Sequence, residues 1–273
     1  MTTPLISVIV TTKNSERTID RCLRCIANQT YPNIEIIVVD NNSSDNTKKI
    51  AHKYCQLVYD IGPERSAQRN LGIRVAKGDY ILYLDSDQYI HKHTLITCFL
   101  CSKYIDMICI PEINYPFTLL NKAINYEKKI TSHKRDKALP RFFKKDVFKT
   151  IGLFNEDRTF DEDVELFIRA REKGFITGKI NVPLLHDESI NIWEMIKKYS
   201  YYGSQSSLNK NMKYNKEIKK YYSLDAQFFK NCIYFAVKNP VLFFFGMTMK
   251  TFKYSSFFIN MCLKRGTVAY YKK

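Results

Sequence analysis

The sequence predicts an α/β protein: an open mixed sheet flanked by helices, followed by a helical extension rich in basic and aromatic residues. Three observations support this prediction. Apolar β-branched runs alternate with segments of helical periodicity over about the first 90 residues, polar and acidic residues follow these runs, and the composition changes near residue 190.

The first predicted strand is the apolar run at residues 5–10, which ends in a polar stretch from Thr11 to Asn14. Ile19, Leu23 and Ile26 then repeat at helical spacing. Ligands of such sheets bind beyond the carboxyl ends of the strands, so the polar residues that follow each strand are the candidate binding residues. The alternation continues through the predicted helix at 18–28, strand at 34–40, strand at 57–59, helix at 66–76 and strand at 80–84.

The composition is that of a globular protein with a surplus of positive charge. Of the 273 residues 45% are hydrophobic and 26% charged, which excludes wholesale disorder, collagen-like repeats and coiled coil. Lys and Arg total 43 against 27 Asp and Glu, a net charge of +16. Such a surplus implies phosphate in a nucleic acid, an anionic membrane face or a phosphorylated ligand.

Most of that surplus lies near the end of the chain. Residues 191–273 contain 15 Lys and Arg, 3 Asp and Glu, and 20 of the 38 aromatic residues. Leu242, Phe245, Met249, Phe252 and Ile259 fall near one predicted helix face. We therefore expect one α/β domain at 1–190, with halves at about 1–90 and 91–190, and a helical extension at 191–273 that packs on it.

The N-terminal residues lack the basic region and cleavage site of a secretory leader. The uninterrupted apolar stretch from Val241 to Met247 is too short to cross a bilayer, which takes about 18 residues or more. We therefore expect a cytoplasmic protein without a transmembrane helix.

The eight cysteines include two pairs with C-x-x-C spacing, Cys22 with Cys25 and Cys98 with Cys101. This spacing occurs in zinc and redox sites. Both pairs fall in predicted helices, where such residues simply share a face, so we expect reduced, buried thiols.

Asp85-Ser86-Asp87 directly follows an apolar predicted strand and is the strongest local sign of chemistry. Two carboxylates at a strand end suit Mg²⁺ or Mn²⁺, which completes its shell with phosphate oxygens and water. A solvated turn is the alternative for this pattern taken alone.

Several other motifs accompany Asp85-Ser86-Asp87 and indicate which kind of protein carries it. Together they resemble a family 2 glycosyltransferase of the GT-A (Rossmann-like) fold over about residues 5–190. The motifs are Val38 to Asp45, Arg65 to Gly72, Gly78 to Asp87, Arg141-Phe142-Phe143, Ile151 to Glu156, and Phe160 to Leu166.

The resemblance implies a nucleotide-sugar donor site. Thr11 and Asn14 would line the nucleotide pocket, and Asp40 would accept a hydrogen bond from a uracil or guanine base. Asp40 as a turn or helix-capping residue is the alternative. Arg65 and Arg69 would lie near the diphosphate. The alternative for each arginine is an ordinary surface charge.

The same resemblance implies how the metal ion is held. Asp87 would be the main ligand of Mn²⁺ or Mg²⁺, Asp85 would contact ribose or the metal, and Ser86 would belong to the donor site. His186 follows an apolar run and would complete the metal shell, or serve as a structural or phosphate-binding histidine.

Asp163 matches the Asp of the family's E-D motif and would act as general base on the acceptor hydroxyl. One base without a covalent nucleophile predicts inversion at the anomeric carbon. The alternative for Asp163 is a carboxylate that favours a helix N-terminus. Glu162, Arg141 and Glu127 are candidate acceptor contacts.

The function predicted is transfer of one sugar, from a UDP-sugar in preference to a GDP-sugar, to a glycan or lipid-linked acceptor. The sequence does not decide between the two bases. The extension suggests a peripheral protein on an anionic cytosolic membrane face, or a core and dimer contact of a homo-oligomer. Processive synthases add spanning helices and a Q-x-x-R-W motif, which are absent from this sequence.

Two other classes compete with the transferase. A nucleic-acid binder, or a membrane-surface protein that keeps the fold without activity, would also explain the charge. However, no nucleic-acid-binding signature is found in the sequence, and acidic strand ends would repel a polyanion. A nucleotidyltransferase would need a Gly-rich loop after the first strand, which this chain lacks.

Overall fold

The computed structural model describes residues 3–131, 139–158, 161–188, 192–206, 213–222 and 226–270. The chain forms two compact units. The first unit comprises Met1–Ile113, Ala138–Asp157 and Glu162–Asp187, and the second comprises Asn114–Lys137, Arg158–Asp161 and Glu188–Lys273. The second unit thus takes in residues 114–137, from the middle of the half predicted at about 91–190.

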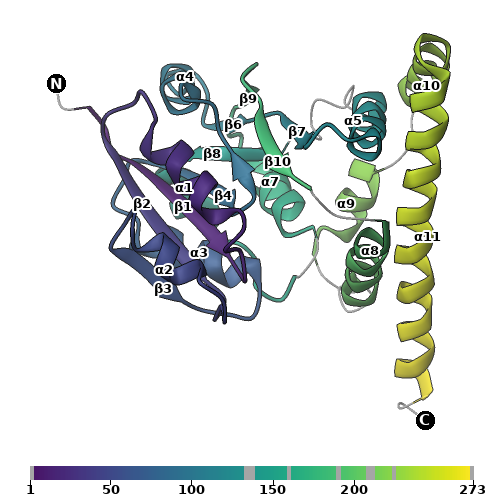
Figure 1. The fold of residues 1–273 in the computed structure, drawn as a ribbon, viewed down its shortest axis with the longest axis horizontal. Helices are drawn as coiled ribbons and strands as arrows, with labels where there is room; N and C mark the ends of the chain where they lie inside the picture. Colours follow the sequence, from purple (N-terminus) through teal and green to yellow (C-terminus); the bar gives the residue numbers. More distant parts are fainter. Residues whose placement is uncertain are drawn as a thin grey trace. The chain divides into compact units, whose positions relative to one another are not determined.

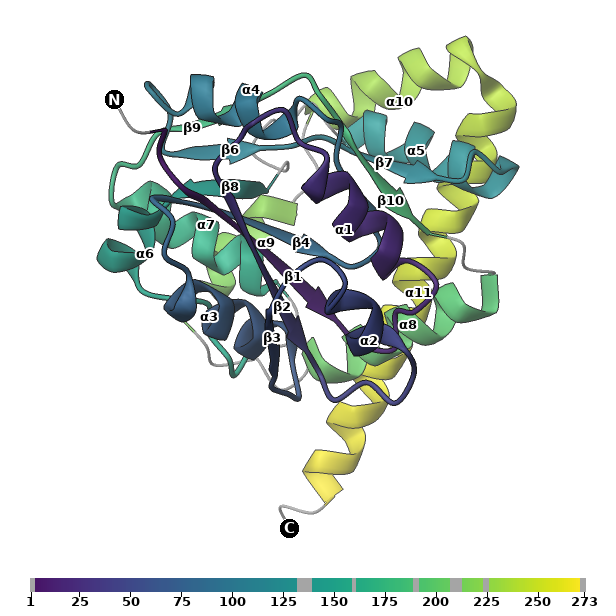
Figure 2. The same ribbon diagram turned by 60° about the vertical axis from the view of Figure 1, so that its left-hand side comes forward.

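A seven-stranded mixed sheet forms the centre of the first unit (Figure 1). Its order is β3-β2-β1-β4-β8-β6-β9, and β8 runs antiparallel to both β4 and β6 (Figure 2). The mixed α/β sheet expected from the sequence is confirmed. The strands are β1 (Ile6–Thr12), β2 (Ile34–Asp40), β3 (Leu57–Asp60), β4 (Tyr80–Asp85), β6 (Met107–Cys109), β8 (Pro140–Lys144) and β9 (Thr177–Lys179).

Helices cover both faces of this sheet because the side chains of a strand alternate between its faces. Val8 and Val10 of β1 share a buried cluster with Leu23 of the first helix, and Ile9 points to the other face. A Cβ atom on Gly72 would lie 2.4 Å from Ile9 Cγ2, so the glycine allows close helix packing there. The helices of this unit are α1 (Ile19–Ala27), α2 (Thr47–Ala51), α3 (Arg65–Val75), α4 (Thr94–Cys101), α6 (Lys145–Ile151) and α7 (Glu162–Glu172).

A second sheet of three strands follows the order β5-β10-β7. Its strands are β5 (Gln88–Tyr89), β7 (Glu112–Tyr115) and β10 (Leu184–Asp187). β10 pairs antiparallel with β5, which sets His186 opposite Gln88. This pairing brings His186 next to Asp85-Ser86-Asp87 although about a hundred residues separate them in the sequence.

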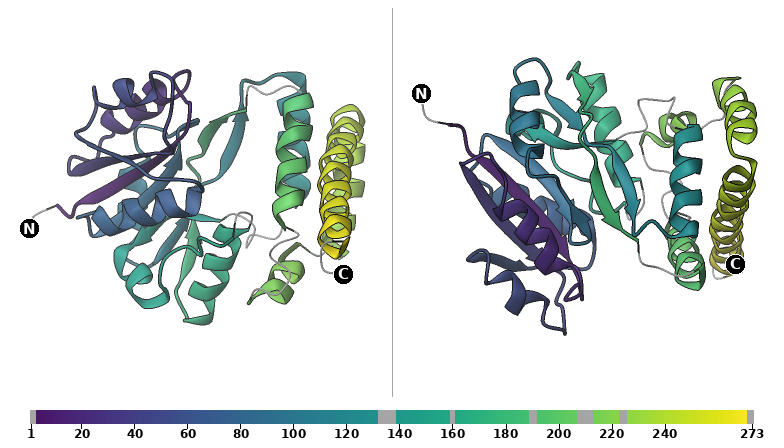
Figure 3. Two further views of the ribbon diagram at one scale, coloured as in Figure 1. Left: turned by 90° about the horizontal axis from the view of Figure 1, so that it is seen from below. Right: turned by 45° about the horizontal axis from the view of Figure 1, so that its top comes forward.

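The second unit is helical. The long helix α11 packs on α5, α8 and α10, with α5 and α8 along the same side of it (Figures 1 and 3). Gly246 and Gly203 allow close approach, since added Cβ atoms would lie 2.6 Å from Ala123 O and 2.0 Å from Phe257 O. The helices are α5 (Leu119–Thr131), α8 (Ile192–Ser206), α9 (Asn215–Tyr222), α10 (Ala226–Lys238) and α11 (Pro240–Tyr270).

The inward face of α11 differs from the predicted one. Met249 is buried as expected, but Phe252 and Ile259 are 46% and 58% exposed. Gly246 and the half-buried Lys253 occupy the inward side instead. The hydrophobicity of these residues alone therefore did not identify the side of α11 that packs on α5 and α8.

No helix among the described residues is long and apolar enough to cross a membrane. Cys22 and Cys98 are buried, and Cys25 and Cys101 are half-buried, all four as free thiols. The predicted burial thus holds for Cys22 and Cys98, while Cys25 and Cys101 are half-buried.

The contribution of the Asp106 carboxylate, just before β6, to the stability of the protein can be tested. Its carboxylate accepts hydrogen bonds from Lys144 Nζ at 2.8 Å and Ile176 N at 2.9 Å. Burial alone would raise its pKa, but these bonds lower it below the ordinary value. A lowered folded pKa stabilises the protein above the unfolded pKa of about 3.9, and that contribution is lost as the pH falls through the folded value.

We therefore expect Asp106→Asn to cost about 1 kcal/mol in free energy of unfolding at pH 7 and much less at pH 3. Urea denaturation at the two pH values measures this difference. Asp146→Asn is the control because its side chain is 80% exposed, and it should cost little at either pH. An Asp106→Asn cost that is the same at both pH values would contradict the assignment.

Candidate active site

The register of the parallel strands brings the predicted site residues to one edge of the sheet. Thr11 pairs with Asp85 across β1 and β4, and Thr12 pairs with Asp40 across β1 and β2. Thr11 Oγ1 donates a hydrogen bond to Asp85 Oδ1 at 3.1 Å. Ser86 continues this edge, and its Oγ donates to Ser15 Oγ at 2.8 Å.

Asp40 holds the turn that follows β2. It is fully buried, and the amide and hydroxyl of Ser43 each donate to one of its carboxylate oxygens at 2.6 Å. This is the turn role that was the alternative for Asp40.

The loop after β1 is tied to the loop after β2. Asn14 has a positive φ of 45°, a conformation that asparagine tolerates, and its Oδ1 accepts from Ser44 N at 2.9 Å. Ser15 N donates to Thr47 Oγ1 at 2.7 Å, and Glu16 Oε2 accepts from Asn46 N at 3.0 Å. Asn14 is therefore placed at the predicted edge, with its side chain holding the neighbouring loop.

Asp85 lies among three positively charged groups. Arg69 Nη2 donates to its Oδ1 at 3.2 Å, and Arg141 Nη1 lies 3.9 Å from its Oδ2. Gln88 accepts from the Asp85 amide and donates to its carboxylate. Burial would raise the pKa of Asp85, but the charges of Arg69, Arg141 and Arg65 hold it well below its usual range. Asp85 is thus ionised, with both oxygens in contact with protein groups.

Arg69 joins Asp85 to the start of α7. Its Nη1 donates to Glu162 Oε1 at 3.0 Å, and its guanidinium lies 4.7 Å from the ring centre of Tyr83. The Arg69 side chain is 3% exposed. Arg65 Nη2 is 3.9 Å from the same Glu162 oxygen and is 41% exposed, which leaves Arg65 open to solvent.

Glu162 is held by these ion pairs and is 4% exposed. Burial, and then the charge of Asp163, raise its pKa above the ordinary value, although Arg65 and Arg69 oppose the shift. Its ion pairs with Arg65 and Arg69 hold it in place at the start of α7, and its predicted acceptor contact stays a prediction.

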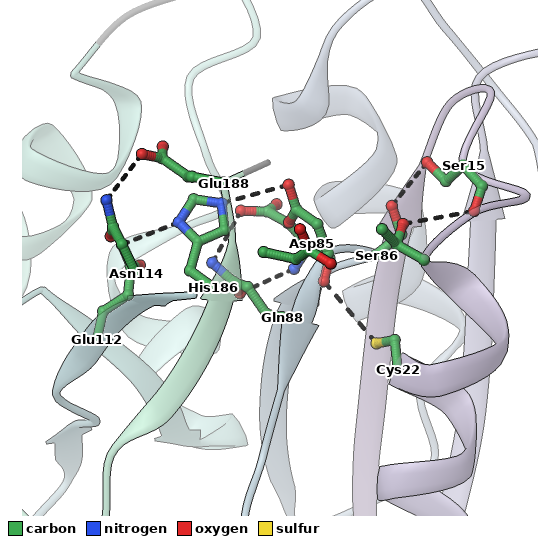
Figure 4. Close-up of polar contacts among 12 residues, drawn as sticks. Ser15, Cys22, Asp85, Ser86, Gln88, Glu112, Asn114, His186 and Glu188 are labelled. Atoms are coloured by element: carbon green, nitrogen blue, oxygen red, sulfur yellow. Dashed lines mark hydrogen bonds and ion pairs between the residues drawn. The ribbon is translucent and has the colours of Figure 1, made fainter. Parts of the chain in front are cut away.

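Asp87 and His186 are in contact beside Asp85, with the Asp87 side chain 37% exposed and that of His186 13% exposed. His186 Nε2 lies 3.3 Å from Asp87 Oδ2, and its Nδ1 lies 3.0 Å from Glu112 Oε1; Figure 4 shows the surroundings of His186, Asp85 and Gln88. Burial would lower the pKa of His186, but its hydrogen bonds with Asp87 and Glu112 raise it to about 10. Asp87 Oδ1 is buried and accepts no hydrogen bond from any described residue.

These contacts test whether the site suits a metal ion. The described part of the chain holds no group of three His, Cys, Asp or Glu arranged as a complete metal centre. Mg²⁺ and Mn²⁺ nevertheless need only one or two protein ligands when phosphate and water supply the rest. Asp87 Oδ1, which has no partner among the described residues, fits that requirement, whereas both oxygens of Asp85 have protein partners.

Asp163 lies in the first turn of α7, where its Oδ1 accepts a hydrogen bond from the next amide, Val164 N, at 2.9 Å. It is half-buried and close enough to Tyr83 and Arg141 to influence their ionisation. This position is compatible with both the base and the helix-terminus interpretation.

Like Glu162, the other two candidate acceptor contacts have protein partners. Arg141 donates to Glu112 Oε2 at 3.2 Å and belongs to the Asp85 surroundings. Glu127 lies on α5 in the second unit, where it pairs with Lys250 Nζ at 2.5 Å and is 13% exposed. The contact between Glu127 and Lys250 joins α5 to α11.

Three residues of the site were not predicted. Glu112 binds both His186 and Arg141, Gln88 binds Asp85, and the Tyr83 ring supports Arg69. Gln88 follows Asp85-Ser86-Asp87 directly, so its place in the sequence was a usable sign. Glu112 is 74 residues from His186, and no local pattern marks it.

Residues 7–99 match the family model described as Glycosyl transferase family 2. This match covers about a third of the chain and supports the resemblance to family 2 found in the sequence. Among curated relatives of the chain, the glycosyltransferase AglE of Haloferax volcanii is 29% identical over 196 residues, which cover 64% of each chain. TarS of Staphylococcus aureus, a poly(ribitol-phosphate) β-N-acetylglucosaminyltransferase, is 39% identical over 99 residues, 33% of this chain and 17% of TarS. The chain thus spans less than two thirds of the length of these family 2 relatives.

Solved structures of glycosyltransferases share the fold. TarS residues 1–349 in complex with UDP-GlcNAc superimpose with a TM-score of 0.54 at 18% identity, covering 96% of this chain and 92% of that one. The mannosyltransferase PcManGT of Pyrobaculum calidifontis, in complex with GDP-Man and Mn²⁺, gives 0.57 at 16% identity, covering 90% and 74%. The expected GT-A fold is confirmed.

Proposed function

We propose that this family 2 chain transfers a sugar from a nucleoside-diphosphate sugar to a hydroxyl of a glycan or lipid-linked acceptor, with inversion. The observation that carries the proposal is the buried Asp87 Oδ1 atom at the carboxyl edge of the sheet, which has no described partner, while the other oxygen of the same carboxylate lies 3.3 Å from His186 Nε2. A buried carboxylate oxygen without a hydrogen bond is costly unless a ligand completes it.

In this proposal Asp87 holds a divalent cation, Mn²⁺ or Mg²⁺, with Asp85 behind it, and His186 would join the metal shell on giving up the proton that its raised pKa retains. The cation supplies positive charge to the leaving diphosphate. PcManGT, whose structure contains Mn²⁺, shares the fold and supports this choice. Asp85 keeps Arg69 and Arg141 oriented, so the edge retains positive charge whether or not the cation is bound.

The donor base and ribose are proposed to lie along Thr11, Asn14, Asp40 and Ser86, with the diphosphate near Arg65. Arg65 is suited to this task because its side chain is 41% exposed, whereas Arg69 is buried and acts from behind through Asp85. We propose a UDP-sugar ahead of a GDP-sugar. TarS, whose structure holds UDP-GlcNAc, is 39% identical to this chain over 99 residues.

Asp163 is proposed as the general base. A sugar hydroxyl is a poor nucleophile near neutral pH, so a positioned carboxylate removes its proton as the oxygen attacks C1. Attack from the face opposite the diphosphate then inverts the configuration. Asp163 suits this role better than Glu162 because Glu162 is bound by Arg65 and Arg69.

A thermal-shift experiment tests the donor site. A UDP-sugar at about 100 times its dissociation constant, with Mn²⁺, should stabilise the wild type by about 2.7 kcal/mol, or roughly 5–11 °C in Tm. We expect Asp87→Ala to lose this shift and Asp146→Ala, at an exposed position on α6, to keep it.

Each outcome is informative. A shift with GDP-sugars alone would replace UDP by GDP in the proposal. A full shift in Asp87→Ala would contradict the role of Asp87, and no shift with any nucleotide-sugar, together with stabilisation by RNA, would contradict the transferase proposal itself.

A further inference from the structure

The outward side of α11 carries no charge from Val241 to Ile259. A helix on the surface of a soluble protein normally turns its charged residues to water. Here Phe244, Phe258 and Ile259 are 66%, 51% and 58% exposed. The exposed positions of this stretch hold only apolar, aromatic and hydroxyl side chains, at Val241, Phe244, Thr248, Thr251, Phe252, Tyr254, Ser255, Phe258 and Ile259.

The two lysines of the same stretch lie on its inward side. Lys250 is 17% exposed and pairs with Glu127 of α5. The Lys253 amine lies 5.5 Å from the ring centre of Tyr199 of α8, and burial lowers its pKa. α11 therefore has its lysines on the packed side and apolar side chains on the exposed side, the opposite of a helix that faces water.

The preceding helix α10 adds further exposed apolar residues. Phe229, Ile233 and Val237 are 58%, 70% and 81% exposed and recur every four residues, so they line one side of α10. Lys230 and Lys238 are exposed on the same helix. The exposed apolar and aromatic residues of α10 and α11 are called the outer apolar face below.

A shallow pocket of about 550 Å³ opens on α11. Met247, Tyr254, Phe258 and Ile259 line it together with Phe228 of α10, and Lys250 is the charged residue among its lining groups. An aliphatic chain is the ligand that such an apolar lining suits.

The charge of the segment selects the partner. From Ala226 to Lys273 the sequence contains eight Lys and Arg and no Asp or Glu. Among the described residues, Lys230 and Lys238 of α10 are the exposed lysines of this segment, and the headgroups of anionic lipids would complement them, whereas the same segment of a second copy offers no acidic side chain. Aromatic and aliphatic side chains beside lysines are typical of helices that lie in a membrane interface.

We propose that the outer apolar face binds an anionic lipid surface, with α10 and α11 lying in the interface and Lys230 and Lys238 near the headgroups. This inference rests on the second unit alone and does not depend on the proposed transferase activity. It predicts binding that needs both the apolar side chains and low or moderate salt.

Vesicle flotation of the full chain tests the proposal. Vesicles of phosphatidylcholine with about 30% phosphatidylglycerol should carry the protein to the top of the gradient, and pure phosphatidylcholine should carry much less. We expect Phe244→Asp to lower the partition coefficient roughly tenfold or more, since it removes a Phe from the apolar phase. Replacing Lys230 and Lys238 by Gln should lower it about 5-fold per lysine.

The matched control is Leu100→Asp on α4. It makes the same apolar-to-acidic change at a position that is 54% exposed but lies in the first unit, and it should leave flotation unchanged. Thermal melts of all variants check that they are folded. Absence of wild-type flotation at low salt, or equal loss in Leu100→Asp, would overturn the proposal. A dimer that Phe244→Asp dissociates, without any vesicle binding, would assign the face to self-association instead.

Discussion

Replacing Asp163 with asparagine is expected to lower kcat by about 10²- to 10⁴-fold, the contribution typical of a positioned general base. The change keeps the size of the side chain and its ability to accept the hydrogen bond from Val164 N, so the helix start should persist. KM for the donor should change little, because Asp163 is not proposed to touch the nucleotide. Initial rates with a nucleotide-sugar donor and an acceptor measure both constants.

Asp157→Asn is the control for this prediction, because Asp157 is an exposed acidic residue in the turn before α7. Its kcat should match the wild type. A fall of less than about threefold in Asp163→Asn would assign Asp163 to the helix terminus alone, and the base would have to be sought elsewhere.

Arg69→Met is expected to destabilise the protein by about 3–5 kcal/mol, because it removes one partner from a buried ion-pair network. Glu162 Oε1 would lose its 3.0 Å partner, and Asp85 Oδ1 would lose its partner at 3.2 Å. The side chain of Glu162 is only 6% exposed, so water cannot fully replace the arginine. The expected fall in Tm is roughly 6–20 °C, measured by calorimetry or by urea denaturation.

The same helix provides the matched variant. Arg74 pairs with Glu156 at 3.5 Å, but both side chains are about half exposed, so Arg74→Met should cost less than about 1 kcal/mol. Adding Glu162→Gln to Arg69→Met should recover part of the loss, because one buried charge then disappears. Equal costs for Arg69→Met and Arg74→Met would show that burial does not strengthen the Arg69 pairs.

The fold of the first 90 residues could be predicted because its signals are local. Apolar runs such as Val8 to Val10 and the spacing of Ile19, Leu23 and Ile26 specify strands and helices without knowledge of distant partners. The orientation of α11 could not be predicted in this way. Lys250 turns inward because Glu127, more than a hundred residues earlier, lies opposite it.

The candidate site likewise contains residues that local sequence signals mark and contacts that they do not. Thr11, Asp85 and Asp87 were identified because they follow strands, and parallel strands end at one edge. The burial of Arg69, the ion pairs of Glu162 and the hydrogen bond from His186 to Glu112 depend on contacts between separate elements. No spacing rule within one segment reports such contacts.

The hydrogen bonds between the loops after β1 and β2 make the two loops one cooperative unit. Asn14 and Ser15 bind Ser44 and Thr47, and Glu16 binds Asn46, so neither loop can open locally without breaking bonds to the other. A ligand that orders one loop therefore restricts the fluctuations of both. The same bonds mean that an insertion or deletion in either loop disturbs the other, so the lengths of the two loops are expected to vary together rather than separately.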